Sequence, residues 1–137
     1  MSLHPYIHFQ GQCAPALAFY AEVFDAPAPK IMTFGQAPGG PQGPAGERVM
    51  HAHVEIAGGL LMASDFPLGF EGDPQKAFSV TVLLDSVEAA RRIYDRLMEG
   101  GDVIHEFGAS FFSEGFGMLR DRFGTHWIVM KESEGLR

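Results

Sequence analysis

The sequence predicts an α+β fold built from two βαβββ modules, one near residues 4–66 and the other near 78–131. Three observations support this: short segments alternate apolar and polar residues, two stretches have helical spacing, and the same order of elements occurs twice. The two halves match in the order of their predicted elements but share few identical residues. If each helix covers one face of its sheet, the opposite faces stay open, and two curved mixed sheets would form a cup. At 137 residues we expect a single domain, 1–137, with a substantial core.

The first module opens with a strand near 6–10. Ile7 and Phe9 would point into the core, and Tyr6 and His8 would point to the open face.

A helix is expected next, because apolar residues follow at helical spacing and Pro15 suits a first turn. After a short strand at 30–34 comes 35–47, which holds five glycines and three prolines. This composition predicts a mobile loop without a regular element, which could close over a ligand.

The clearest alternation runs from Met50 to Ile56, where every even position is apolar. On a strand, this places His51, His53 and Glu55 on one face, with about 7 Å between successive side chains. A glycine pair then predicts a tight turn into an antiparallel strand at 60–64.

The second module opens with a strand at 78–84, with Phe78 on its core face. Asp85 is expected to cap the following helix, with Glu88 in capping-box position, and Gly100-Gly101 to end it. Three further strands are predicted at 102–107, 111–120 and 126–131.

Charge and composition exclude several classes of protein. The net charge is −7 and no run of Lys or Arg exceeds two residues, so we expect no nucleic-acid partner. No window approaches 18 apolar residues and no secretory signal is evident, which predicts a cytoplasmic protein without a membrane partner. Cys13 is the single cysteine, so an intrachain disulfide is excluded, and a packed cysteine is favoured over a reactive one. Asp121 to Gly124 is predicted to be a turn capped by Asp121.

Several motifs together resemble PhnB-like proteins of the glyoxalase/bleomycin-resistance/extradiol-dioxygenase group, the vicinal oxygen chelate superfamily. The motifs follow one another along nearly the whole chain. They are Pro5-Tyr6-Ile7-x-Phe9, Ala16-x-x-Phe19-Tyr20-x-x-x-Phe24, Val49-Met50-His51-Ala52, Met62-x-Ser64-Asp65, Leu97-x-x-Gly100-Gly101 and Phe116-Gly117-Met118-x-x-Asp121-Arg122-Phe123-Gly124-x-x-Trp127.

The resemblance implies paired βαβββ modules, often in a homodimer that shares the cup. It also implies a divalent metal held by His and Glu on four strands. The corresponding positions here fall near His4, Met62, Ser79 and either Ile128 or Val129. Since at best one of these is a ligand, we expect the family's usual metal site to be absent.

Three interpretations of the histidine-rich strand remain open. His8, His51, His53 and Glu55 could form a displaced site for zinc, iron or nickel. His51 and Glu55 could instead act as a metal-free acid/base pair. The favoured interpretation is a polar pocket wall without chemistry.

Aromatic residues favour a small organic ligand in the cup, which Tyr6, Phe111, Phe112 and Phe116 would line. The other expected ligand-binding residues are His8, His53, Met62 and Ser79. Trp127 is either core, which is favoured, or an aromatic wall of the cup.

The leading hypothesis is therefore a small-molecule-binding protein of glyoxalase-like fold without the standard metal. The alternatives are a metal-dependent lyase, isomerase or dioxygenase that uses the displaced His/Glu site, and a purely structural dimerisation module. Whether the protein is an enzyme stays open. No cofactor motif is present, and without a glycine-rich loop after a strand we do not expect methyl transfer.

Overall fold

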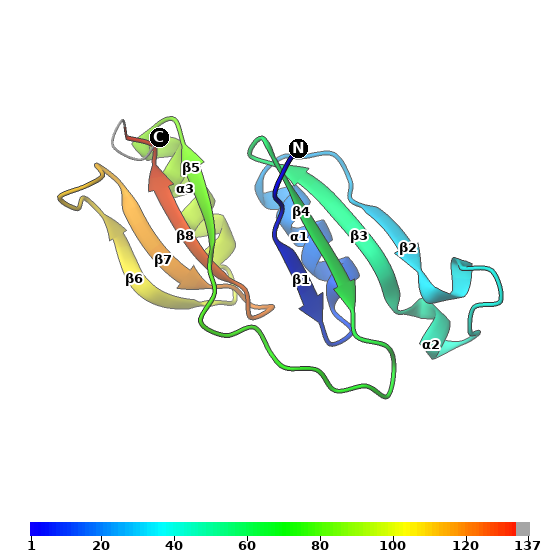
Figure 1. Cartoon of the computed structure of the whole chain (residues 1–137). Coiled ribbons are helices and arrows are strands. Elements are labelled where there is room, and N and C mark those ends of the chain that lie inside the picture. Colours follow the sequence, from blue (N-terminus) through cyan, green and yellow to red (C-terminus); the bar gives the residue numbers. More distant parts are fainter. Residues whose placement is uncertain (134–137) are drawn as a thin grey trace. The chain divides into compact units, whose positions relative to one another are not determined.

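The computed structural model describes residues 1–133 and divides into two compact units, residues 1–75 and a second beginning at Lys76 (Figure 1). Each predicted module lies within one unit. No helix among the described residues has both the length and the apolar character needed to cross a membrane.

The first unit has the predicted βαβββ order. Its main elements are β1 (Tyr6–Phe9), α1 (Cys13–Val23), β2 (Lys30–Thr33), β3 (Val49–Ile56) and β4 (Gly59–Asp65). The strands form one mixed sheet in the order β1-β4-β3-β2, with β1 parallel to β4 and the other pairs antiparallel. Helix α1 packs on one face of this sheet (Figure 1).

The second unit repeats the arrangement. Its elements are β5 (Val80–Leu84), α3 (Val87–Met98), β6 (Asp102–Gly108), β7 (Phe116–Arg120) and β8 (His126–Lys131). The sheet order is β5-β8-β7-β6, and β5 is parallel to β8. Each strand therefore occupies the same place in its sheet as its counterpart in the first unit, which confirms the α+β fold of two βαβββ modules.

Each unit has a core between its sheet and its helix. In the first unit, Ile7 and Phe9 of β1 are 3% exposed, as the alternation predicted. The second core includes Trp127, which is 1% exposed. Further buried side chains are Leu17, Tyr20, Val54 and Leu61 in the first unit, and Val82, Leu97, Leu119 and Val129 in the second.

Asp65, at the end of β4, joins the sheet of the first unit to the start of α1. The N-cap residue of α1, Gln12, supplies no side-chain hydrogen bond. Instead Asp65 Oδ1 accepts hydrogen bonds from the backbone N–H groups of Gly11 (3.0 Å) and Cys13 (2.9 Å), and Oδ2 accepts one from Val49 (2.9 Å). A buried carboxylate from a distant strand thus satisfies donors at the helix N-terminus, which lack intrahelical partners.

The prediction that 35–47 holds no regular element is wrong. The segment contains part of a 3₁₀ turn, η1 (Phe34–Gln36), and a short helix, α2 (Pro44–Glu47). Its glycines permit close backbone approach: a Cβ at Gly40 would overlap the Phe34 carbonyl oxygen, and a Cβ at Gly46 would overlap the Pro41 carbonyl oxygen. Glycine here allows the segment to fold tightly on itself.

The predicted strand at 111–120 begins only at Phe116. Before it, a turn forms in which the Ser110 N–H donates to the Ser113 carbonyl (2.8 Å) and the Ser113 hydroxyl donates to the Lys131 carbonyl (3.0 Å). Serine hydroxyls compete with ladder hydrogen bonds in this way, and the turn places Phe111 fully in solvent.

Two boundaries in the second unit also differ from the prediction. Phe78 lies before β5 and is 49% exposed, so it is not a core residue. Helix α3 is capped by Ser86, whose Oγ accepts from the Ala89 N–H (3.1 Å), and not by Asp85. Ser86 is the capping residue because it directly precedes the first helical residue, a position from which its hydroxyl reaches the N–H of the third helical residue, Ala89.

Candidate functional site

The face of the first sheet that α1 does not cover, the open face, carries most of the predicted site residues. The strand register places Tyr6 beside Met62, Met62 beside His53, and His53 beside Lys30, across all four strands. Residues that are paired across strands point to the same face of a sheet. The open face accordingly holds Tyr6, His8, Lys30, Met32, His51, His53, Glu55, Met62 and Ser64.

Tyr6 and three histidines form a continuous array of rings on this face. The Tyr6 ring centroid lies 4.9 Å from that of His8 and 5.8 Å from that of His51, and His51 lies 5.9 Å from His53. The Tyr6 hydroxyl and His51 Nδ1 are 3.3 Å apart, a hydrogen bond whose direction depends on the imidazole tautomer. Strands β1 and β3 are not neighbours, so the tyrosine side chain crosses β4 to make this contact.

His8 is held on its other side by Phe66, which follows β4. The two rings are nearly parallel, with centroids 5.4 Å apart and 20° between their planes. His8 Nδ1 also lies 3.3 Å from the Ser64 hydroxyl. These contacts fix the orientation of the imidazole at the edge of the array.

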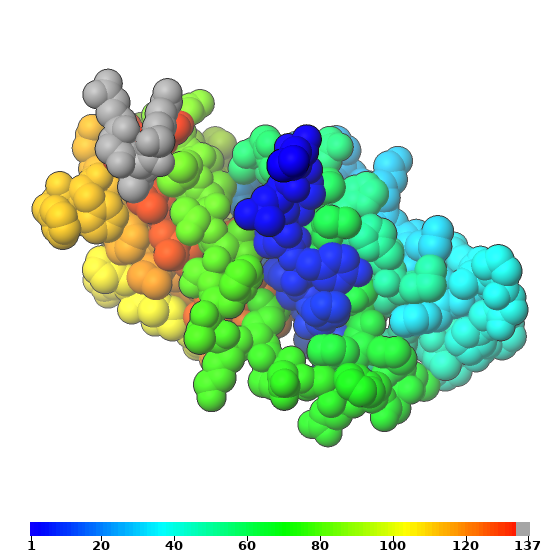
Figure 2. All heavy atoms as spheres, in the orientation of Figure 1, coloured from blue at the N-terminus to red at the C-terminus, as the bar shows by residue number. Residues whose placement is uncertain are grey.

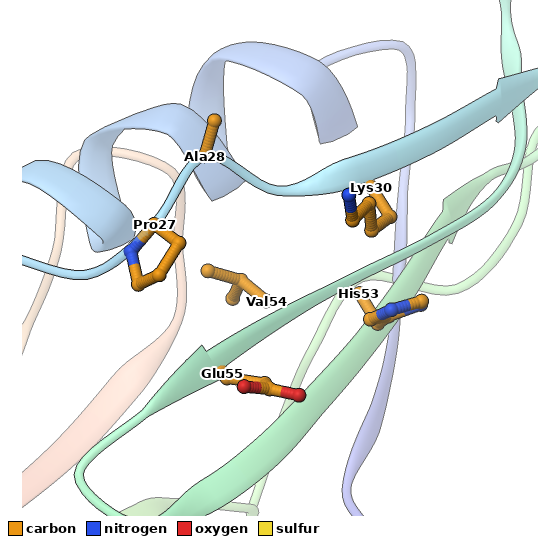
Figure 3. Close-up of a pocket in the computed structure, with 6 residues that line it drawn as sticks. All are labelled: Pro27, Ala28, Lys30, His53, Val54 and Glu55. Carbon is orange, nitrogen blue, oxygen red and sulfur yellow. The ribbon is translucent and has the colours of Figure 1, made fainter.

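A pocket of roughly 100 Å³ opens at the β2 edge of the same sheet (Figure 3). Its lining residues are Pro27, Ala28, Lys30, His53, Val54 and Glu55. Strand β2 starts at Lys30, opposite His53, and the residue before it, Pro29, has no N–H with which to extend the ladder. The chain therefore leaves the edge of β3 at this point, and Lys30 and His53 stand together beside the recess (Figure 3).

The suggested acid/base residues His51 and Glu55 are not in direct contact. Four residues of extended strand span about 13 Å, and His53 stands between them on β3. His51 has Tyr6 as its hydrogen-bond partner, whereas Glu55 is exposed at the pocket. The two side chains can act together only on a ligand that spans His53.

Residues 1–133 contain no group of three or more His, Cys, Asp or Glu side chains that could hold a metal ion. His8, His51, His53 and Glu55 lie in a row along two strands, whereas metal ligands must converge on one point. At the position nearest the family's first ligand, the His4 ring instead bonds to the Ser2 hydroxyl (2.7 Å). The donor set of the described residues does not fit the family's metal.

In the second unit, the predicted aromatic lining forms a chain of edge-to-face contacts. Phe112 lies 5.2 Å from Phe111 and 5.0 Å from Phe116, and Phe116 lies 5.2 Å from His105. Ser79 is half-buried and precedes β5. Trp127 belongs to the core, where its indole N–H donates to Asp121 Oδ2 (2.8 Å), so a ligand cannot reach it as a wall of the cup.

Cys13 is a packed residue at the start of α1, as favoured from the sequence. Its side chain is fully buried, and burial, with a smaller contribution from the Asp65 carboxylate, raises the pKa of the thiol to about 12. A thiol needs its thiolate form to act as a nucleophile. Cys13 therefore has no role as a nucleophile in the folded chain.

We expect Cys13 to be unreactive toward a thiol reagent such as Ellman's reagent at pH 8 in the native protein. With a pKa of about 12, only about one thiol in ten thousand would be ionised, and the reagent would also need access to a buried site. The same protein in strong denaturant should release one equivalent of chromophore. Stoichiometric reaction of the folded protein within minutes would contradict this assignment.

Comparison with known proteins agrees with the fold and the motifs. A family model described as 3-demethylubiquinone-9 3-methyltransferase matches residues 1–130. The chain belongs to this PhnB-like family. The curated protein YjdN from Escherichia coli K12 is 33% identical over 143 residues, covering 94% of each chain.

Solved structures show that this PhnB-like chain has the fold of glyoxalase/bleomycin-resistance proteins. Protein PA1353 from Pseudomonas aeruginosa is 31% identical, with a TM-score of 0.87 and coverage of 96% of this chain and 98% of the other. Two more distant structures share the fold. They are a Bacillus cereus PhnB protein (23% identical, TM-score 0.76, coverage 96% and 100%) and a glyoxalase/bleomycin-resistance domain from Frankia sp. EAN1pec (16%, 0.65, 98% and 93%). The sequence-based assignment to the PhnB-like family and to this fold is confirmed, and the family's description assigns no activity to this chain.

Sequence reasoning missed two residues that shape the open face. Lys30 was part of a short strand with no assigned role, yet the register pairs it with His53. Phe66 follows the last strand predicted for the first module and had no assigned role, yet it stacks on His8. Both contacts depend on strand pairing, and neighbours in the sequence give no signal for them.

Proposed function

We propose that this PhnB-like protein binds a small organic molecule on the open face of the first sheet, without the metal usual for the superfamily. The observation that carries the proposal is the Tyr6–His51 hydrogen bond within an array of four rings. Ring faces and the Met62 side chain offer apolar contact, and the hydroxyl and imidazole groups offer a few oriented polar contacts. That combination is typical of small-molecule sites.

A fragment screen by ligand-observed NMR tests the proposal. Fragments that bind the wild type should lose at least about tenfold in affinity when His51→Ala removes an anchor worth about 1.4 kcal/mol or more. Tyr6→Phe should weaken the same fragments by removing only the hydroxyl. His4→Ala is the matched control, because His4 precedes β1 and contacts Ser2. Fragments that bind all four proteins equally would place the site elsewhere and refute the proposal.

Metal analysis of untagged protein by plasma mass spectrometry tests the absence of a metal. The proposal expects no stoichiometric zinc, iron, nickel or manganese. A stoichiometric metal that is lost in His51→Ala would instead support the metal-dependent lyase, isomerase or dioxygenase.

We propose in addition that the protein is a homodimer. Membership of the superfamily supports this, as do Ile31 and Met32, which are 38% and 49% exposed on the edge strand β2. Sedimentation velocity over a dilution series should give a dimer, and a monomer at all concentrations would refute it.

A further inference from the structure

The open face of the first sheet is rich in hydrogen-bond donors. Three imidazoles, the Tyr6 and Ser64 hydroxyls and the Lys30 ammonium can all donate there. Glu55 is the one carboxylate among the described residues of this face. The whole chain carries a net charge of −7, whereas on this face the charges of Lys30 and Glu55 cancel.

The one permanently charged donor of this face, Lys30, lies at the pocket together with His53. Lys30 and His53 are register partners on β2 and β3, a position in which Cβ atoms are about 5 Å apart. Both line the recess of roughly 100 Å³, which has room for a carboxylate or phospho group (Figure 3). Hydrogen bonds from charged donors to such groups are about twice as strong as neutral ones.

The ring array continues from this pocket. His51 lies 5.9 Å from His53, and Tyr6 lies 5.8 Å from His51. A planar group attached to the anion would therefore lie against ring faces. The pocket is open to solvent on one side, so a ligand can enter without unfolding the sheet. Strand β2 forms this edge of the sheet and belongs to the light-blue part of the surface in Figure 2.

We propose that the ligand of this face is an organic oxyanion with a planar body. The anionic group binds between Lys30 and His53, and the body lies along the rings of His51 and Tyr6. This inference rests on the proposed binding function and names the class of its ligand. The carboxylate or phospho character of the anion is an outcome of the test below.

Binding should take up protons, because imidazolium is a better partner for an anion than imidazole. The groups that face the ligand are Tyr6 and His8 from β1, Lys30 from β2, and His51, His53 and Glu55 from β3; β4 contributes uncharged side chains. Affinity should thus fall as the pH of the assay rises, by up to about tenfold per pH unit for each proton taken up.

Glu55 gives the inference a test in which two variants act in opposite directions. Its carboxylate lines the same pocket as Lys30 and repels an anion bound there. Glu55→Gln keeps the shape of the side chain and removes this repulsion, so anion affinity should rise severalfold. Lys30→Met removes the attracting charge and should lower affinity by about tenfold, within the range measured for charge-assisted contacts. Lys76→Met is the control, since it removes an equal charge from a lysine that does not line the pocket.

The experiment uses four probes with one aromatic body and different charges: benzoate, phenyl phosphate, benzyl alcohol and benzylamine. Affinities of the full chain and the three variants are measured by calorimetry at pH 6 and 8, with the imidazole signals followed by ¹H–¹⁵N NMR. We expect the two anions to bind and to shift the His51 and His53 signals. Benzoate, which is fully ionised throughout this range, should lose at least about fivefold in affinity from pH 6 to 8. Phenyl phosphate gains negative charge over the same range, so its affinity is compared with that of benzoate at pH 8 only. Benzyl alcohol and benzylamine should bind at least tenfold more weakly than benzoate.

Each other outcome overturns the inference in a distinct way. If benzylamine or benzyl alcohol binds as tightly as the anions and shifts the same histidines, the face binds small molecules but does not select oxyanions. If Glu55→Gln weakens anion binding as much as Lys30→Met does, the anion is not held in this pocket. If none of the four probes binds, the oxyanion class is refuted, and the fragment screen separately decides whether the face binds any small molecule.

Discussion

Replacing Asp65 by alanine is expected to lower the free energy of unfolding by about 3–5 kcal/mol. The carboxylate is 4% exposed and accepts hydrogen bonds from three backbone N–H groups, of Gly11, Cys13 and Val49. Alanine would leave these donors without their acceptor, and each buried donor left unpaired costs about 1–3 kcal/mol. Urea unfolding followed by circular dichroism would measure the change.

Asp65→Asn separates the charge from the shape of the side chain. The asparagine oxygen can still accept at one of the two carboxylate oxygen positions. At the other position, its NH₂ group would face a backbone N–H, and two donors cannot form a hydrogen bond with each other. This variant should therefore also destabilise the protein, by about 2 kcal/mol or more. Asp73→Asn is the matched control, because Asp73 is exposed in the segment before the second unit and should change stability by less than about 0.5 kcal/mol. An Asp65→Ala protein as stable as this control would contradict the assigned role.

The strands around the candidate site could be predicted because one physical signal dominated them. From Met50 to Ile56 every second residue is apolar, and only an extended strand puts Ala52, Val54 and Ile56 on one buried face. The same alternation placed Ile7 and Phe9 correctly. Burial on one face requires this period of two, so the pattern identifies both the strand and its inward side.

The segment at 35–47 could not be predicted, because glycine has two opposite uses. It makes a free chain flexible, and it also allows backbones to approach more closely than a Cβ would permit. At Gly40 and Gly46 the second use applies, and both glycines pack against carbonyl oxygens of the same segment. Composition alone does not distinguish a mobile loop from a tightly folded one.

The identities of the site residues were readable from the sequence, whereas their partners were not. His51 and Glu55 are on one face as expected, yet the partner of His51 is Tyr6, 45 residues earlier in the chain. This contact requires β1 to lie beside β4 and β4 beside β3, so it depends on the order of strands in the sheet. Periodicity gives the face of each strand but not its neighbours, which is why Lys30 and Phe66 were also missed.

Asp121→Ala is the second substitution for which we expect a large loss of stability, about 3–5 kcal/mol. Asp121 is 2% exposed and its Oδ1 accepts from the N–H groups of Phe123 (2.8 Å) and Thr125 (3.0 Å). Its Oδ2 accepts from the indole N–H of Trp127 (2.8 Å). Trp127 is the single tryptophan of the chain, so its fluorescence during urea unfolding reports directly on the second unit.

A double-mutant cycle with Trp127→Phe assigns part of this effect to the indole contact. Trp127→Phe keeps an aromatic ring in the core but removes the N–H donor, and its stability is followed by circular dichroism because the fluorophore is lost. A hydrogen bond to a charged acceptor contributes about 1.5–3 kcal/mol, so the two substitutions should be non-additive by about this amount. Additive effects would mean that Asp121 acts through the turn alone.

The backbone contacts of Asp121 would still hold the turn between β7 and β8 in that case, because Phe123 and Thr125 lie within it. The indole contact has a different consequence, since it ties this turn to the core between the sheet and α3. Asp65 does the equivalent in the first unit by tying β4 to the start of α1. A measured coupling between Asp121 and Trp127 would therefore indicate that the second module, like the first, uses a buried carboxylate to fix a loop against its own core.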